Sequence, residues 1–212
     1  MVGKQDRAGG FAPAEADDLL IDRYLPRFDV TLIEHSVADA EIAHTWTALR
    51  EFDLLDVHSP LTDAAMFARG VPAALAARLG HRAPPEPPAR LTLVDGPAME
   101  GWLSLGEREG REIAFGAVGR FWQPDIRWYD VSAMTPATFA AFAEPDWGRI
   151  AASFSLRPYG RHRTLISYEA RTATGDPRSR QRFARYWRVV RPFVRSIMRA
   201  SVGTLARAAE AR

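Results

Sequence analysis

Two residues of opposite charge, Glu169 and Arg171, lie two positions apart in the segment SYEARTAT. Successive side chains of a β-strand point to opposite faces of the sheet, so residues two apart share a face. If that face points into the protein, we expect the pair to form a polar end in an apolar cavity and to orient a carboxylate or carbonyl group. If it points outward, the pair is a surface ion pair worth about 0–1 kcal/mol. The spacing alone allows both orientations.

His35 and Glu169 are the candidates for acid–base catalysis. His35 lies in the predicted strand RFDVTLIEHSV, and an imidazole titrates close to neutral pH. A structural or exposed histidine is the alternative interpretation. The chain has no GxxxxGK[ST] loop, no GxGxxG after a strand and no serine in a nucleophile elbow. Whether the protein catalyses a reaction stays open.

The sequence predicts neither a metal nor another cofactor. The chain has no cysteine and no HExxH motif. No close pair occurs among the five histidines, which are His35, His44, His58, His81 and His162. The absence of cysteine excludes disulfides and fits a reducing cytoplasm. No stretch approaches the roughly 20 apolar residues that span a bilayer, so we expect a cytoplasmic protein without integral membrane association.

Aromatic side chains are concentrated in the predicted strands. They are Trp102, Phe115, Phe121, Trp122, Trp128, Phe154 and Tyr168. In the segment IAFGAVGRF, alternation places Phe115, Ala117, Gly119 and Phe121 on one face. The small side chains between bulky rings leave room for a ligand, or simply allow the strand to bend. A packed core is the alternative for the whole aromatic set.

The segment RQRFARYWRVVRPFVRSIMRA, residues 180–200, is both basic and amphipathic. From Asp176 to Arg212 there are ten arginines and two carboxylates, although the whole chain has a net charge of only +2. Such asymmetry is typical of contact with a polyanion or a membrane surface. We keep this function as an alternative, and expect no nucleic-acid partner.

An apolar stripe in the same segment favours a helix that covers a core. Its residues follow 4, 3, 4, 3 spacing and are Phe183, Trp187, Val190, Val194 and Ile197. Most of the arginines lie off this stripe, so a helix face exposed to solvent explains their presence. Pro192 lies inside the helix and should kink it, because proline removes a backbone hydrogen bond.

The predicted elements give an α+β chain with one domain at residues 26–209. Residues 1–25 are predicted to be a flexible N-terminal segment with one helical turn near its end. A strand at 27–37 is followed by two short helices at 38–52 and 60–80. Strands follow near 90–95, 100–107, 111–122, 148–158 and 163–173, and a long helix closes the chain.

This order resembles the helix-grip fold of the SRPBCC, or START-like, superfamily, which includes polyketide cyclases. PRFDVTLIEHSVADAEIAHTWTAL resembles its opening strand and the "apaeeVWaal" helix. YEARTATGDPRSRQRFARYWRVVRPFVRSIMR resembles the ending of a bacterial branch, in which a "tETRv" strand leads into a "RFrrYWrvvrP" helix. In that pattern Glu169 and Arg171 match the Glu and the Arg. The resemblance covers about residues 26–205.

The resemblance implies a curved antiparallel sheet wrapped around the long C-terminal helix, with a cavity for a hydrophobic small molecule between them. We expect the ligand to be a lipid, a polyketide-like molecule or an aromatic compound. A cyclase or dehydratase using the same cavity is the alternative, and a homodimer stays open. The residues expected to contact the ligand are Trp102, Phe115, Phe121, Phe154, Tyr168, Glu169, Arg171 and Trp187.

Overall fold

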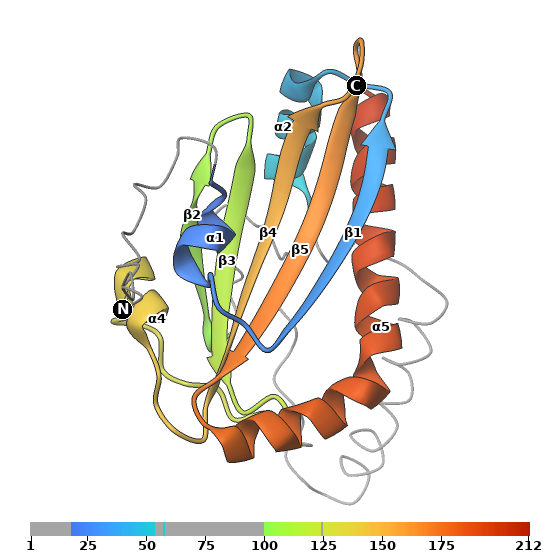
Figure 1. Cartoon of the computed structure of the whole chain (residues 1–212). Coiled ribbons are helices and arrows are strands. Elements are labelled where there is room, and N and C mark those ends of the chain that lie inside the picture. The colour runs from blue at the N-terminus through green and yellow to red at the C-terminus, as the bar shows by residue number, and fades with distance from the viewer. Residues whose placement is uncertain (1–17, 54–56, 58–99, 124) are drawn as a thin grey trace, which may run out of the picture.

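The computed structural model describes residues 18–53, 57, 100–123 and 125–212. The predicted second helix, the strand near 90–95 and the start of the N-terminal segment lie outside these residues. The described elements are α1 (Leu20–Tyr24), β1 (Val30–Ala38), α2 (Ile42–Glu51), β2 (Trp102–Arg108), β3 (Glu112–Gly119), α4 (Pro136–Ala141), β4 (Gly148–Pro158), β5 (Thr164–Thr174) and α5 (Pro177–Glu210) (Figure 1).

The five strands form one antiparallel sheet in the order β1-β5-β4-β3-β2. This arrangement and the long C-terminal helix packed on it confirm the predicted α+β helix-grip class. The predicted turn between β2 and β3 is confirmed as well, because Gly110 has a φ of 67°. Such a backbone conformation favours glycine.

Both faces of the sheet carry apolar side chains, so the sheet has a core on each side. Every residue of β3 is buried. On one face, here called the inner face, Phe115 and Phe154 pack with α2 and the end of α5. On the opposite, outer face, Ala114 and Val118 pack with α1 and α4. Figure 1 shows these two helix pairs on either side of the strands.

Helix α5 begins at a well-formed cap and ends at Glu210. The Asp176 carboxylate accepts hydrogen bonds from the backbone N–H groups of Arg178 and Ser179, and Pro177 occupies the first turn. Pro192 lies inside the helix, and Figure 1 shows a bend between the part below the sheet and the part beside β1. The missing backbone donor of Pro192 accounts for this bend.

Residues 20–25 do not belong to a flexible segment, which corrects the predicted boundary at residue 26. Leu20, Ile21 and Leu25 are buried on the outer face. The helical turn expected there forms as α1, and the Glu112 carboxylate accepts a hydrogen bond from the Leu20 N–H at 2.8 Å. The domain therefore includes α1, because its apolar side chains complete the outer core.

Candidate functional site

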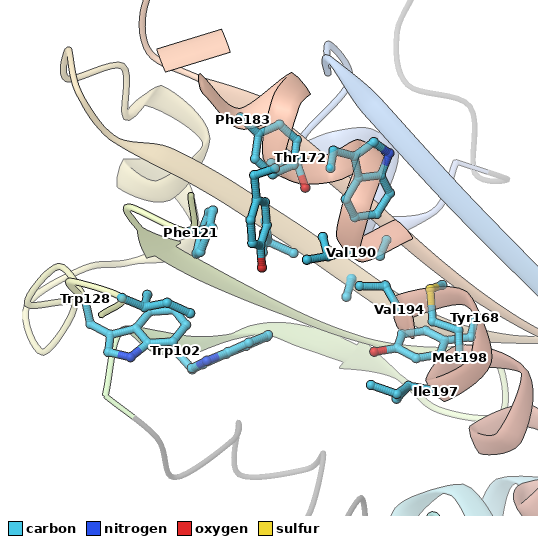
Figure 2. A pocket seen from close by; sticks show the side chains of 16 residues that line it. Trp102, Phe121, Trp128, Tyr168, Thr172, Phe183, Val190, Val194, Ile197 and Met198 are labelled. Carbon is cyan, nitrogen blue, oxygen red and sulfur yellow. The ribbon is translucent and has the colours of Figure 1, made fainter. Parts of the chain in front are cut away.

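A pocket of about 220 Å³ lies between the inner face of the sheet and the part of α5 from Phe183 to Met198 (Figure 2). Three groups of residues line it: alternate positions of β4 and β5, an aromatic group around the end of β3, and the apolar stripe of α5. They are Trp102, Phe121, Ile126, Trp128, Ile150, Ala152, Tyr168, Ala170, Thr172, Phe183, Tyr186, Trp187, Val190, Val194, Ile197 and Met198.

The floor of the pocket follows from strand alternation. Tyr168, Ala170 and Thr172 are every second residue of β5 and share the inner face, as do Ile150 and Ala152 of β4. Ile150 lies opposite Thr172, and Ala152 lies opposite Ala170. The two alanines leave space above the middle of the floor, where larger side chains would meet α5.

The wall is the predicted apolar stripe of α5. Phe183, Trp187, Val190, Val194 and Ile197 all line the pocket. After Met198 the same side of the helix continues into the core, where Val202 and Leu205 are buried. The stripe therefore covers an apolar space as far as Met198 and a packed core beyond it.

An aromatic group closes one end of the pocket. The Trp102 ring centroid lies 6.1 Å from that of Trp128, and the Phe121 centroid lies 5.8 Å from that of Trp128. A Cβ atom on Gly119 would approach the Phe121 and Trp128 rings to 3.0 Å. The room expected beside Gly119 is thus occupied by the protein's own rings rather than left for a ligand.

Phe115 and Phe154 support the floor from within the core and do not line the pocket. Phe154 stacks on Tyr168 with ring centroids 4.1 Å apart and an interplanar angle of 15°. Phe115 lies 5.7 Å from Trp102 and 6.5 Å from Tyr168, measured between ring centroids. These two phenylalanines therefore fix the positions of two pocket residues.

The polar groups that the described lining offers are hydroxyls and indole N–H groups. Figure 2 shows the Tyr168 hydroxyl pointing into the pocket. Burial raises the pKa of Tyr168 to about 12, so this group is protonated at neutral pH and can donate a hydrogen bond. Thr172 contributes a second hydroxyl.

A buried carboxylate lies beside the pocket, on the edge strand. Glu34 of β1 is the register partner of Tyr168 and is 7% exposed. Its Oε1 accepts a hydrogen bond from Nε of Arg195 at 2.5 Å, and its Oε2 accepts one from Nε of Arg199 at 3.1 Å. Burial raises the pKa of Glu34, but the two arginines outweigh it and the net pKa is lowered. Glu34 therefore stays charged and joins β1 to α5.

Glu169 and Arg171 lie on the outer face, so the inward orientation is wrong. Arg171 Nε donates to Glu169 Oε1 at 2.6 Å, and its Nη2 donates to Asp22 Oδ1 at 2.6 Å. The same guanidinium donates to the backbone oxygens of Ile21 and Leu25. Instead of orienting a ligand, Arg171 attaches the C-terminal end of α1 to the sheet.

His35 also lies on the outer face, away from the pocket. It is exposed, and its Nδ1 is 2.8 Å from Oγ of Ser167. Neither residue named for acid–base chemistry, His35 or Glu169, therefore reaches the pocket. Within the part of the chain that the structure describes, no three ligand-type side chains (His, Asp or Glu) are grouped closely enough to hold a metal ion.

Four of the seven arginines in segment 180–200 form ion pairs within the chain. Arg180 pairs with Asp29 at 2.6 Å and Arg182 with Asp146 at 3.2 Å. Arg195 and Arg199 pair with Glu34, as described above. These four arginines thus attach α5 to β1 and to the residues that precede β1 and β4. Among the described helices, none combines the length and apolarity needed to cross a bilayer.

No family model matches the chain, and no curated protein matches it in sequence. Among solved structures, a hypothetical protein from Helicobacter pylori is 9% identical with a TM-score of 0.42, over 89% of this chain and 93% of that chain. CalU16 from Micromonospora echinospora is 12% identical with a TM-score of 0.28, over 85% and 84% of the two chains. The Zhui aromatase/cyclase from Streptomyces sp. R1128 is 11% identical with a TM-score of 0.30, over 84% and 94%.

Proposed function

We propose that this protein binds an apolar or amphipathic small molecule in the pocket between the sheet and α5. The observation that carries the proposal is the lining itself, which is apolar and aromatic apart from a few hydroxyl and N–H groups. Apolar concavities of this kind are the usual form of small-molecule sites. Apolar contact would supply most of the affinity, at about 25 cal/mol for each Å² removed from water.

Binding without catalysis is the interpretation that the described residues favour. The described lining contains no carboxylate, imidazole or amine that could move a proton at neutral pH. A cyclase or dehydratase would need such a group close to its substrate. We therefore propose a binding or carrier protein in preference to the enzyme alternative.

A polyanion-binding function has less support from the structure. Arg180, Arg182, Arg195 and Arg199 are engaged by carboxylates of the same chain. Binding through arginines would weaken steeply as salt rises, whereas filling an apolar pocket should be nearly independent of salt. Ligand affinity measured at low and high salt separates the two hypotheses.

Native mass spectrometry of the purified chain, followed by organic extraction, tests the proposal. We expect a retained small molecule, or uptake of an added apolar probe such as tetralin. Ala170→Trp should abolish retention, because the indole would fill the space above the floor. Ala184→Trp is the matched control, since Ala184 lies on the exposed side of α5. Equal retention by both variants, or no uptake by the unmodified protein, would contradict the proposal.

A further inference from the structure

The Tyr168 hydroxyl is a hydrogen-bond donor that has no protein partner among the described residues. It points into the pocket (Figure 2), and none of the hydrogen bonds found for the described part of the chain involves it. The ring cannot easily turn away, because it is stacked on Phe154 at 4.1 Å between centroids. The Tyr168 hydroxyl therefore has a fixed position in an apolar space and can donate a hydrogen bond to a ligand.

The absence of charged groups in the described lining limits the kind of ligand that this donor can bind. The described lining holds no ionisable side chain of either sign apart from the tyrosines. Glu34, the carboxylate next to Tyr168 in the sheet, is already paired with Arg195 and Arg199. A charged ligand would lose its hydration without gaining a counter-charge, which is strongly unfavourable.

The volume limits the size of the ligand. An apolar protein cavity of about 150 Å³ accepts benzene. The pocket here measures about 220 Å³, which is enough for one or two fused rings. The aromatic side chains Trp102, Trp128 and Trp187 offer ring faces on which such a ligand can stack.

We propose that the pocket selects an uncharged molecule of one or two fused rings that carries an acceptor oxygen, and that Tyr168 is the residue that recognises this oxygen. The inference rests on the proposed function, because it names the ligand class of the same pocket. A ketone or quinone oxygen has the required chemistry: it accepts the phenolic hydrogen and brings no charge into the pocket. The Thr172 hydroxyl lies on the same strand face and is available to a second polar atom.

Equilibrium dialysis of the full chain against three bicyclic probes tests this assignment. The probes are 1-tetralone, its hydrocarbon counterpart tetralin, and the anion 2-naphthoate. We expect 1-tetralone to bind more tightly than tetralin and 2-naphthoate to bind least. Tyr168→Phe should weaken 1-tetralone binding by about two- to tenfold, the range of one net hydrogen bond, and change tetralin binding by less than twofold. Tyr159→Phe, at an exposed tyrosine, is the matched control and should change neither.

The possible results separate this inference from the proposed function. Equal affinity for 1-tetralone and tetralin, with no effect of Tyr168→Phe, would overturn the role of Tyr168 while leaving a binding pocket. Tighter binding of 2-naphthoate would overturn the selection for an uncharged ligand. Failure of all three probes to bind would contradict the proposed function itself. Retained tetralin binding by Tyr168→Phe shows that the variant has folded.

Discussion

Glu34 on the edge strand β1 and Arg195 on α5 form an ion pair with 2.5 Å between Oε1 and Nε. Arg199, one turn further along the helix, binds the other carboxylate oxygen at 3.1 Å. A single buried carboxylate thus links the edge of the sheet to the part of α5 that follows Pro192. The pocket wall and the core part of the helix meet at this link.

Replacing Glu34 by glutamine should lower the free energy of unfolding by about 1–3 kcal/mol at pH 7, because charge-assisted hydrogen bonds are lost. The pKa of Glu34 is lowered in the folded protein, so its stabilising contribution is present above the unfolded pKa and disappears as the pH falls through the folded value. Urea unfolding at pH 7 and pH 3 measures this. Glu51→Gln, in the exposed pair with Arg212, is the control and should cost less than about 1 kcal/mol. An equal loss at both pH values for Glu34→Gln would refute the electrostatic explanation.

Glu112 should show the opposite dependence on pH. Burial raises the pKa of this carboxyl above its ordinary value of 4.5, although the Leu20 N–H and nearby arginines favour the charged form. The folded state therefore binds a proton more readily than the unfolded state, and stability falls as the pH rises through the folded pKa. Glu112→Gln keeps an acceptor for Leu20 and removes the charge. It should be at least as stable as the unmodified protein at pH 7, with the difference vanishing under acidic conditions. A variant that is clearly less stable at pH 7 would show that the charge stabilises α1.

Arg171→Met should destabilise the protein without affecting the pocket. It leaves the buried Glu169 carboxylate without its guanidinium partner, and breaking a buried pair of this kind costs about 3 kcal/mol or more. Loss of the pair with the more exposed Asp22 adds less. Because the side chain lies on the outer face, tetralin affinity should change by less than twofold. Trp187→Ala is the counterpart within the pocket and should weaken tetralin binding. Unfolding measurements and equilibrium dialysis on both variants separate the effect on stability from the effect on binding. Loss of tetralin binding by Arg171→Met would show that Arg171 does contribute to the pocket.

Gly101→Ala should be more costly than Gly110→Ala. Both glycines have positive φ, 78° and 67°, so both variants incur backbone strain of about 1–2 kcal/mol. A Cβ atom on Gly101 would in addition lie 2.5 Å from Cε3 of Trp128, whereas the nearest atom to a Cβ on Gly110 is at 3.7 Å. We expect the overlap to add about 1–3 kcal/mol, measured by thermal unfolding. Trp128→Leu in the Gly101→Ala background removes the ring atoms but keeps the Cβ atom of residue 128, at 2.8 Å, so it should recover part of this loss; no recovery would show that the overlap with the ring adds nothing.

Much of the fold could be predicted because each element has a local cause. The 4, 3, 4, 3 spacing predicted α5, and alternation predicted β4 and β5 to within a residue at each end. Gly110 marked the turn between β2 and β3. Such patterns depend on neighbouring residues in the chain, so they can be read without knowing what packs against them.

The face of the sheet that lines the pocket could not be predicted in the same way. Alternation tells which residues share a face, but here α1 and α4 make the outer face apolar as well. Tyr168 and Glu169 were both assigned to the site, although adjacent residues of a strand point to opposite faces. Once Tyr168 is taken as inward, the same rule identifies Ala170 and Thr172, which the prediction missed. An alanine on the pocket floor belongs to no sequence motif and has no reactive group. Its place in the pocket is therefore visible only in the structure.

Met198 marks the boundary between two parts of α5 that are under different selective constraints. Beyond it, residues such as Val202 and Leu205 complete the core, so most changes there would cost folding stability. Before it, Trp187 and Val190 line a space, so changes of shape there would alter ligand preference at a smaller cost in stability. A protein built this way can acquire a new ligand in a few mutational steps and still fold. We expect variation among relatives of this chain to be greater at the lining positions from Phe183 to Ile197 than at the core positions Val202 and Leu205.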